Sequence, residues 1–429
     1  MKFVKMSLAA AMLMGASAYA IENVKISGDA SLYYHTQDAD VIAVSTPDMF
    51  EKGASNADIG FSLGVTADLT PGVSAGLTVN ALTTLGVEGT LVNGVWSGAH
   101  TVTGNPLAAL TVEVDDTYWA SEAWVAGTLG KTTAKVGRMA LDTPLAFTET
   151  WGIAPNTFEA AVLINQDIPA TTLVGAYVGK SNGAAMLFPG GNPVALTSIL
   201  TSEATFHEFW AKGAYAVGAI NNSFEPLTVQ GWYYDVQSIA DAYWLQADLN
   251  IAGFLAGVQY TEIDVDDLSD FGLSANNNDD KAWAAMLGYA LKDVVTVKLA
   301  YSEVDETGSD LGGVANIATT TGASKLYTEL WWNFGAADTG AKTWALTADA
   351  TVGGVDLFAG YYETDVEAPA AALGTESEVT EYVVTAGKAF GPLDATVAVI
   401  YDAYDHDGGN VAGDTEDVTA LQLYLTYNF

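Results

Sequence analysis

The sequence has no cysteine, a single arginine and few basic residues of any kind. Without cysteine the chain can form neither a disulfide framework nor a thiolate metal site. With 15 Lys and Arg against 52 Asp and Glu, and a net charge of −37, it lacks the basic clusters that bind phosphate. Nucleic acid is therefore excluded as a natural partner, and a field that repels anions and attracts cations is expected instead.

The sequence also lacks a long apolar segment after residue 20, although half of its residues are hydrophobic. No later segment approaches the roughly 20 consecutive apolar residues that a membrane helix needs. Residues 1–20 have the parts of a secretory signal peptide: a basic start with Lys2 and Lys5, an apolar stretch from Met6 to Met14, and the small residues Ala18 and Ala20. We expect cleavage after Ala20 and export to the periplasm.

The last nine residues alternate between apolar and polar side chains. Because successive side chains of a strand point to opposite faces, one face carries Leu421, Leu423, Leu425, Tyr427 and Phe429. The segment resembles the closing strand of a bacterial outer-membrane β-barrel, whose apolar face and final Phe are the insertion signal read by the barrel-assembly machinery. An edge strand of a soluble all-β protein is the alternative. In the barrel reading this strand pairs with Ile26 to Tyr34 and closes the wall.

Between its two ends the chain consists of short segments in which apolar and polar residues alternate. Tight turns and long polar loops connect these segments by turns. Trp283 to Leu291, for example, turns at Lys292-Asp293 into Val295 to Tyr301, and His207 to Val217 returns through Asn221-Asn222-Ser223 to Val229 to Val236. We predict an all-β, antiparallel transmembrane barrel of about 18 strands, with 16 or 20 as alternatives, in which residues 21–429 form one domain. Leu326 to Phe334 is assigned to a loop, because bacterial barrels have an even strand count. The predicted long outer loops are 36–56, 86–116, 180–205, 264–280, 304–341, 364–378 and 405–416.

The predicted strands have one apolar and one polar face, and eighteen strands leave room for water inside. On one strand Tyr243, Leu245 and Leu249 face outward, while Trp244, Gln246 and Asp248 face inward. By the same alternation the inward charges are Glu122, Glu159, Asp248 and Asp349 against Lys135, Lys212 and Lys298. Aromatic residues near strand ends are expected in girdles at the membrane interfaces; these include Tyr215, Tyr301, Tyr361, Tyr401 and Trp119.

A stretch of about fifty residues carries the most specific pattern. Gly137-Arg138 ends a strand, Thr143-Pro144 lies in the following loop, Pro155-Asn156-Thr157-Phe158 returns to the next strand, and a further strand contains Leu173-Val174-Gly175. This pattern resembles the porin D (occlusin) family and, more closely, the campylobacter-type major outer-membrane porins. The resemblance implies a loop, about 140–157, that folds into the lumen and constricts it. It also implies a general or semi-selective pore for small hydrophilic solutes, often a homotrimer.

Arg138 is the only arginine in the chain. In the family that the pattern resembles, basic residues oppose acidic ones at the constriction, so Arg138 facing Asp142, Glu149 or Glu159 would produce a transverse field. Strand alternation argues against this, because an outward Val136 would place Arg138 outward too. A structural Arg that holds the loop through a carboxylate is the alternative. The sequence also lacks the ladder of arginines typical of porin D, so selectivity for carboxylate-bearing solutes is not expected.

Acidic residues form three clusters in two of the predicted outer loops: Asp264 to Asp270, Asn276 to Asp280 and Asp405 to Asp414. Hard oxygen ligands on loops suit Ca²⁺ or Mg²⁺, although none of the clusters has EF-hand spacing. The candidate ligands are Asp264, Asp266, Asp267, Asp405, Asp407 and Asp414. Solvated loop tips are the simpler interpretation of each cluster, and bridging of the loops to lipopolysaccharide phosphates by divalent cations is the functional one. No cofactor is required.

We therefore predict a porin of the Gram-negative outer membrane that passes ions and small hydrophilic solutes and prefers cations. The expected partners are outer-membrane lipid, lipopolysaccharide and the barrel-assembly machinery. A surface-structural or adhesive barrel is one alternative. An outer-membrane hydrolase is another, since Gly179-Lys180-Ser181-Asn182-Gly183 matches G-x-S-x-G. That motif needs a strand-to-helix turn, whereas here it falls between predicted antiparallel strands, so no enzymatic activity is expected.

Overall fold

The computed structural model describes residues 21–83, 85, 91–92, 116–153, 155–183, 204–210, 212–268, 278–309, 311–319, 322–366, 377–406 and 414–429. The predicted signal peptide, loop 86–116 apart from residues 91, 92 and 116, and most of loop 180–205 lie outside the described residues. So do residues 269–277, 367–376 and 407–413 of the later predicted loops, including Asp407. No helix in the described part of the chain is long and apolar enough to cross a membrane.

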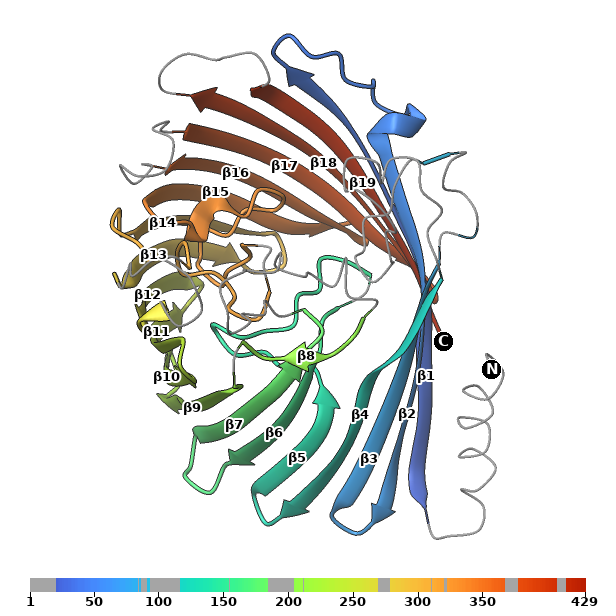
Figure 1. Ribbon diagram of the computed structural model, residues 1–429, viewed down its shortest axis with the longest axis vertical. Helices are drawn as coiled ribbons and strands as arrows, with labels where there is room; N and C mark the ends of the chain where they lie inside the picture. The colour runs from blue at the N-terminus through green and yellow to red at the C-terminus, as the bar shows by residue number, and fades with distance from the viewer. Residues whose placement is uncertain are drawn as a thin grey trace.

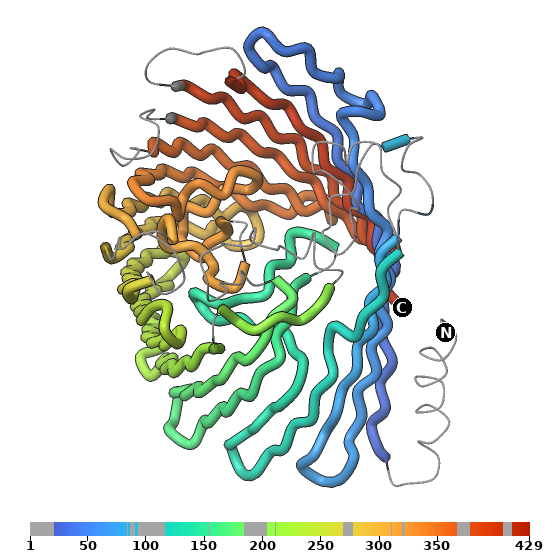
Figure 2. The backbone as a smooth tube through the Cα atoms, viewed as in Figure 1, coloured from blue at the N-terminus to red at the C-terminus, as the bar shows by residue number. Residues whose placement is uncertain are grey.

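The described chain forms one antiparallel sheet of nineteen strands, and β1 pairs with both β2 and β19, so that the sheet closes on itself (Figure 1). The two-residue strand β8 pairs only with β7, beside the β7–β9 pairing, which leaves eighteen strands in the closed wall. The predicted eighteen-stranded barrel is confirmed, with one short extra strand. The tube in Figure 2 shows long connections inside the ring of strands.

The strands have the following bounds: β1 Glu22–Val41, β2 Ser55–Thr70, β3 Val73–Thr83, β4 Thr117–Leu129, β5 Thr132–Met139, β6 Phe158–Asn165, β7 Thr171–Ser181, β8 His207–Glu208, β9 Ala214–Phe224, β10 Leu227–Val236, β11 Ala240–Ile251, β12 Phe254–Val265, β13 Asp280–Leu291, β14 Val295–Val304, β15 Ala341–Val352, β16 Val355–Val366, β17 Ser377–Phe390, β18 Leu393–His406 and β19 Thr415–Asn428. Two 3-10 helices, η2 Lys52–Ala54 and η6 Gly335–Ala337, lie in the connections.

The two ends of the chain close the wall as the alternating pattern predicts. Ser31 of β1 pairs with Thr426 of β19, and Gly28 and Phe429 exchange two backbone hydrogen bonds of 2.9 Å. The last residue is thus fully paired, which removes a free edge. Residues Leu421, Leu423, Leu425, Tyr427 and Phe429 lie on the face opposite the buried Gln422, and Tyr427 and Phe429 are exposed.

Outward side chains are apolar over the strands and aromatic near their outer ends. Ring contacts between neighbouring strands link Tyr233 with Tyr243, Trp283 with Tyr301 and Tyr301 with Trp344, at centroid distances of 4.7–5.3 Å. This is the girdle expected where a barrel meets the membrane interface. Trp119 does not belong to it: its ring is buried beside Leu82, because it alternates with the exposed Tyr118 and so points inward.

Three local predictions are wrong. Asn221-Asn222-Ser223 does not form a turn, because β9 continues to Phe224 and the chain turns at Glu225-Pro226. Asn221 donates its side-chain amide to Thr171 Oγ1 of β7 at 2.7 Å, so this turn-forming residue bonds along the wall. The segment predicted as one strand from His207 to Val217 is broken into β8 and β9 by a turn before Gly213, whose φ is +86°. β1 also extends to Val41, beyond the start of the predicted loop 36–56.

Candidate functional site: a constriction made by two inner loops

Residues 140–157, here called the first inner loop, connect β5 to β6. Thr143 donates from its hydroxyl to the Ala146 carbonyl oxygen (2.7 Å), and Thr148 N–H donates to the Leu141 carbonyl oxygen (2.8 Å), which makes a compact hairpin. Leu145 at its tip is 1% exposed, and its backbone N–H donates to the Tyr234 hydroxyl at 3.3 Å. The loop is therefore fixed against the inner wall.

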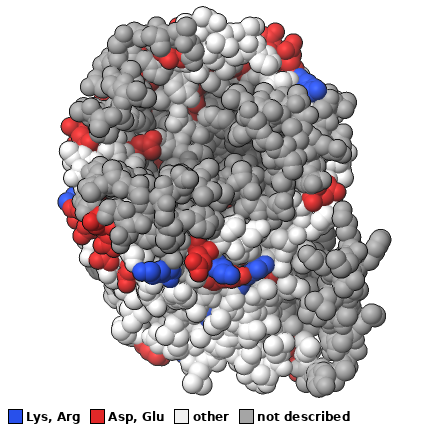
Figure 3. Space-filling model, in the orientation of Figure 1, with Lys and Arg blue, Asp and Glu red and all other residues white. Residues whose placement is uncertain are grey.

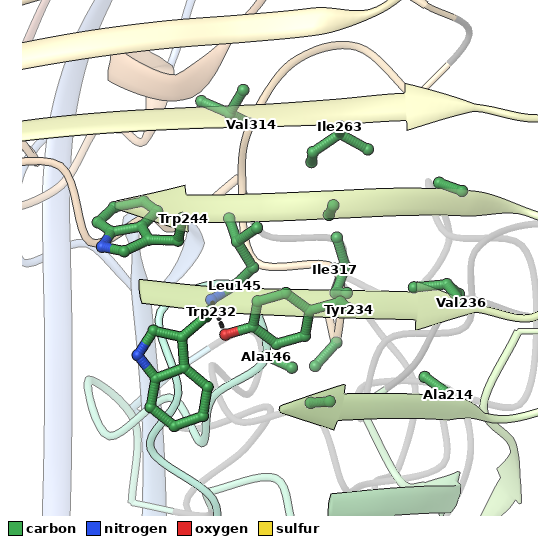
Figure 4. Packing of buried hydrophobic residues seen from close by; sticks show 14 of the residues in the cluster. Leu145, Ala146, Ala214, Trp232, Tyr234, Val236, Trp244, Ile263, Val314 and Ile317 are labelled. Carbon is green, nitrogen blue, oxygen red and sulfur yellow. Dashed lines mark hydrogen bonds between the residues drawn. The ribbon is translucent and has the colours of Figure 1, made fainter. Parts of the chain in front are cut away.

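Figure 4 shows this packing from close by. The side chains of Leu145 and Ala146 lie among Trp232, Tyr234 and other inward residues of β9–β13. Ile317 and Val314, which come from the connection between β14 and β15, lie in the same cluster. An apolar cluster on the inner face of a pore wall shows that loops fill part of the interior at this height.

The described residues of 305–340 form a second inner loop, although the sequence predicts this segment only as part of an outer loop, 304–341. In Figure 1 its orange trace crosses the space inside the ring of strands. Leu326 is buried in the same cluster as Leu145, and Leu330 is buried against β14–β19 with Trp331 and Trp332 beside it. Leu326 to Phe334 is indeed not a strand. Its apolar residues face the wall instead of water, which explains their presence in a polar connection.

Polar side chains of the wall anchor the second inner loop by its backbone. Glu381 of β17, which is fully buried, accepts three consecutive backbone N–H groups, from Trp331, Trp332 and Asn333, at 2.7–2.9 Å. Hydrogen bonds to an ionised acceptor are about twice as strong as neutral ones. Gln259 of β12 adds a reciprocal pair: its side chain donates to the Lys325 carbonyl oxygen (2.9 Å) and accepts from Tyr327 N–H (3.0 Å).

One wall position is shaped to receive the loop. A Cβ built on Gly257 of β12 would lie 2.3 Å from the Tyr327 hydroxyl, so a larger residue there would displace this ring. The same hydroxyl donates to Asp248 Oδ1 at 2.5 Å. Asp248 thus points inward, as its strand alternation predicts, and holds the second inner loop.

The two inner loops are joined to each other through Asn316. Its side-chain oxygen accepts Phe147 N–H at 3.1 Å, and its amide donates to the Phe147 carbonyl oxygen and to Glu149, both at 3.0 Å. The Ile317 N–H donates to the Leu145 carbonyl oxygen at 2.9 Å. Lys325 forms an ion pair with Asp142. The loops therefore behave as one constricting unit.

Arg138 lies where β5 ends and the first inner loop leaves the wall. Its Nε and Nη2 donate to Glu159 Oε1 of β6 at 3.0 and 2.9 Å, and its Nη1 donates to the Ala120 carbonyl oxygen of β4 at 3.0 Å. The Phe206 ring stacks 4.0 Å from the guanidinium carbon. Arg138 therefore ties β4 to β6 across the end of β5.

The backbone before Arg138 is specialised for this geometry. Gly137 has φ +130°, and a Cβ there would lie 2.1 Å from the Ala123 carbonyl oxygen, so only glycine fits. Among the predicted acidic partners the structure brings Arg138 to Glu159, not to Asp142 or Glu149, which bond within the inner loops. The contacts match the structural interpretation of Arg138. The predicted inward orientation of Glu159 is wrong, because Glu159 alternates along β6 with Phe158 and Ala160, which are buried in the inner apolar cluster.

The other predicted pore-lining residues fall into two groups. Lys135 lies 4.0 Å from Glu122 and 4.3 Å from the centroid of the Trp124 ring, on the inward face. Asp349 and Lys298 alternate with the exposed Leu346 and Leu299 and therefore face inward as predicted. Lys212 does not: it lies in the turn between β8 and β9, where its ammonium donates to Ser238 Oγ at 2.8 Å. The broken strand is the reason that its parity prediction fails.

The candidate metal ligands do not converge in the described part of the chain. Among the described residues no group of three or more Asp, Glu, His or Cys side chains is placed to hold a metal ion. Asp264 lies near the end of β12, where burial and the neighbouring Asp279 raise its pKa. Asp266 donates its N–H to the Ile239 carbonyl oxygen, and the Asp414 carbonyl oxygen accepts Ile42 N–H. Asp405 is exposed near the end of β18, opposite Glu378, and Asp267 is exposed after β12.

The structure has a closed wall, an apolar outer belt with aromatic rings, and loops folded inside. These features are typical of a membrane pore. Residues 7–328 match the family model described as Gram-negative porin. The chain belongs to this family. As a Gram-negative porin it is an outer-membrane channel for passive diffusion, a class of protein that is not enzymatic.

Solved structures with the same fold come from Pseudomonas aeruginosa. OccK9 (OpdG) superposes with a TM-score of 0.69 at 16% identity, over 95% of this porin and 98% of that chain. OccK8 (OprE) superposes with a TM-score of 0.68 at 14% identity, over 96% of this porin and 99% of that chain. OpdK, whose structure was solved with vanillate, superposes with a TM-score of 0.66 at 15% identity, over 95% of this porin and 99% of that chain. No curated protein matches the sequence significantly.

Sequence reasoning found the first inner loop but missed the second and its anchors Glu381, Gln259 and Asn316. The available signal was the tryptophan pair Trp331-Trp332, an apolar group in a connection that is otherwise polar. Such a group needs a surface to cover it, and in this porin the inner wall provides that surface.

Proposed function

We propose that this porin prefers cations over anions. The observation that supports the proposal is the charge of the inward face of the described strands, where acidic side chains outnumber basic ones. Alternation with the lipid-facing residues places these acids inward: Asp29, Asp58, Glu122, Asp248, Asp280, Asp349, Asp356, Glu381, Asp394 and Asp402. The inward bases are Lys25, Lys135 and Lys298. A lumen lined by one sign of charge concentrates the opposite ion.

The basic groups closest to the constriction are already paired with carboxylates. Arg138 contacts Glu159, Lys135 lies 4.0 Å from Glu122, and Lys325 pairs with Asp142. A paired base contributes little net positive potential to a passing anion. This arrangement also gives no inward row of arginines, so recognition of carboxylate-bearing solutes finds no support in it. In Figure 3 blue side chains lie next to red ones along one band of the molecule.

The test is the reversal potential of the purified porin in a planar bilayer under a KCl gradient. Stepwise conductance with a reversal potential of the sign for K⁺ is expected. A reversal potential of the sign for Cl⁻ would contradict the preference, and well-inserted protein without steps would contradict the open pore.

Within the family, we infer that the chain is of the campylobacter type and assembles as a homotrimer. The pattern from Gly137-Arg138 through Thr143-Pro144 to Phe158 supports the first inference. Cross-linking followed by electrophoresis of unheated porin tests the second, with a trimeric band as the expected result.

We further propose that divalent cations, Ca²⁺ or Mg²⁺, bridge the outer rim to lipopolysaccharide phosphates. Outward carboxylates lie two positions beyond rings of the aromatic girdle: Tyr260 donates to Glu262 at 2.6 Å, and Glu303 follows Tyr301. Carboxylates facing lipid phosphates repel them unless a divalent cation lies between. Chelation with EDTA should lower the melting temperature of the porin in lipopolysaccharide more than in phosphate-free detergent. We also propose that the barrel-assembly machinery inserts the porin by recognising its closing strand, β19.

The contacts of Ser181 support the absence of hydrolytic activity. Ser181 is fully buried at the end of β7, and its hydroxyl accepts the Gly183 N–H at 3.0 Å. It pairs across the sheet with Phe158 and His207, in a strand instead of a strand-to-helix turn. A nucleophile needs an exposed hydroxyl beside a base. Esterase assays of the purified porin should give no more turnover than Ser181→Ala.

A further inference from the structure

A recess of about 310 Å³ lies between the second inner loop and the wall. Trp332, Phe334, Asn333 and Asp338 of the loop line it together with Tyr404 of β18. Phe334 also lies 6.1 Å, centroid to centroid, from Trp151 of the first inner loop, so the recess borders the junction of the two loops. A solute that crosses the constriction therefore passes beside it.

The aromatic rings of the recess are fixed in place. Trp332 stacks on His35 of β1, with centroids 4.7 Å apart and planes inclined by 17°. Its backbone N–H, like those of its neighbours Trp331 and Asn333, is held by Glu381. Pre-arranged rings bind without an ordering cost.

The polar groups of the recess differ in what they still offer to a ligand. The Asn333 amide donates to the Tyr404 hydroxyl and its oxygen accepts Gly335 N–H, both at 3.3 Å. Glu381 already accepts three backbone N–H groups. The Asp338 side chain, in contrast, is exposed, and no Lys, Arg or His among the described residues lies within ion-pair distance of it. Asp338 is thus the group available to a passing cation.

We propose that this recess is a binding subsite for small organic cations, with Asp338 as the counter-charge and Trp332 and Phe334 as the aromatic surfaces. Ammonium groups are attracted to ring faces within about 6 Å, most strongly to tryptophan. K⁺, with its tight hydration shell, gains less from rings, so the subsite distinguishes organic cations from K⁺. The proposal rests on the cation preference of the pore and names the solute class.

Tetramethylammonium chloride added to K⁺-conducting single channels tests the proposal, at a pH of about 8 where carboxylates are ionised. Concentration-dependent reduction of the K⁺ current is expected. Asp338→Asn should raise the half-blocking concentration about tenfold through loss of the counter-charge. Phe334→Leu should raise it about threefold through loss of the ring face.

Two control variants keep the outcome specific. Asp305→Asn removes an equal charge from an exposed position at the start of the same loop, and Phe254→Leu removes a lipid-facing ring. Both should leave the block unchanged. Block that is insensitive to Asp338→Asn, or equally sensitive to Asp305→Asn, overturns the subsite while leaving the preference for K⁺ over Cl⁻ intact. A reversal potential favouring Cl⁻ instead rejects the proposed cation preference.

Discussion

Both inner loops are held against the inner wall, but by different interactions. The first, 140–157, buries Leu145 and Ala146 in an apolar cluster and adds one hydrogen bond to Tyr234. The second, 305–340, adds polar anchors on distant strands to its apolar contacts, above all Glu381. The first loop is held mainly by shape and the second by charge as well. We therefore expect the second loop to respond more to substitution of polar residues and to pH.

The largest effect should come from Glu381→Gln. A neutral amide keeps one acceptor for three backbone donors, and leaving buried donors unpaired costs about 1–3 kcal/mol each. We expect residues 322–340 to exchange backbone hydrogen faster and the open-channel current to become noisier. Glu363→Gln, an outward acid bonded to Tyr361, is the control. Unchanged exchange in Glu381→Gln would show that apolar contacts alone hold the second loop.

Asn316→Ala tests the junction between the loops. Asn316 is buried and makes paired hydrogen bonds with Phe147 besides its bond to Glu149, so its removal should cost about 2 kcal/mol of loop docking. Both loops should then exchange faster together, as measured by mass spectrometry of deuterium uptake. Asn221→Ala at the far end of β9 should leave them unchanged. Faster exchange in only one loop would contradict a single constricting unit.

Glu329 of the second inner loop should make that loop pH-dependent. Burial, together with the nearby Glu149 and Glu381, raises the pKa of its carboxyl to about 8, although hydrogen bonds from Ser324 act in the opposite direction. The docked loop thus keeps a proton that a released Glu329 loses above its ordinary pKa of 4.5. Docking is therefore strongest below about pH 4.5 and weakens as the pH rises to about 8.

Current noise recorded across this range measures the effect. Because the pKa rises from 4.5 to about 8, we expect loop opening to increase more than about tenfold. Glu329→Gln should remove most of it. Although Asp338 is exposed as a residue, the surrounding loop partly desolvates its carboxyl and raises the pKa of Asp338 to about 6, so a smaller component near that pH should survive in the variant. An unaltered pH profile in Glu329→Gln would assign the dependence to other groups.

Arg138→Gln should have the smallest effect on the constriction and act on the wall. Loss of the contacts to Glu159 and Ala120 should lower barrel stability by about 1 kcal/mol, measured as a lower melting temperature. The ion preference should change little, because the guanidinium is already paired. Lys180→Gln, which removes a longer 3.9 Å contact to the same Glu159, should have less effect on melting. A large shift in reversal potential for Arg138→Gln would show instead that Arg138 contributes to ion selectivity at the constriction.

Strand faces were predictable because side-chain alternation is a local property of an extended chain. Trp244, Gln246 and Asp248 point inward as their spacing predicts, and the closing strand pairs to Phe429. The first inner loop was predictable from its family-like pattern. The second was not, since its anchors Glu381 and Gln259 lie about fifty or more residues away in sequence. The predictions for Lys212 and Trp119 were wrong for a related reason. A break in the strand changes the direction of the Lys212 side chain, and a difference of one position exchanges the outward and inward faces at Trp119.

An acidic lumen whose bases are paired with carboxylates should make this porin cation-preferring. The most direct measurement is the reversal potential of the unmodified porin under a KCl gradient at low ionic strength, where the field is least screened. We expect a potential of the sign for K⁺ that shrinks as the salt concentration is raised. A potential of the sign for Cl⁻, or one near zero at low salt, would contradict it.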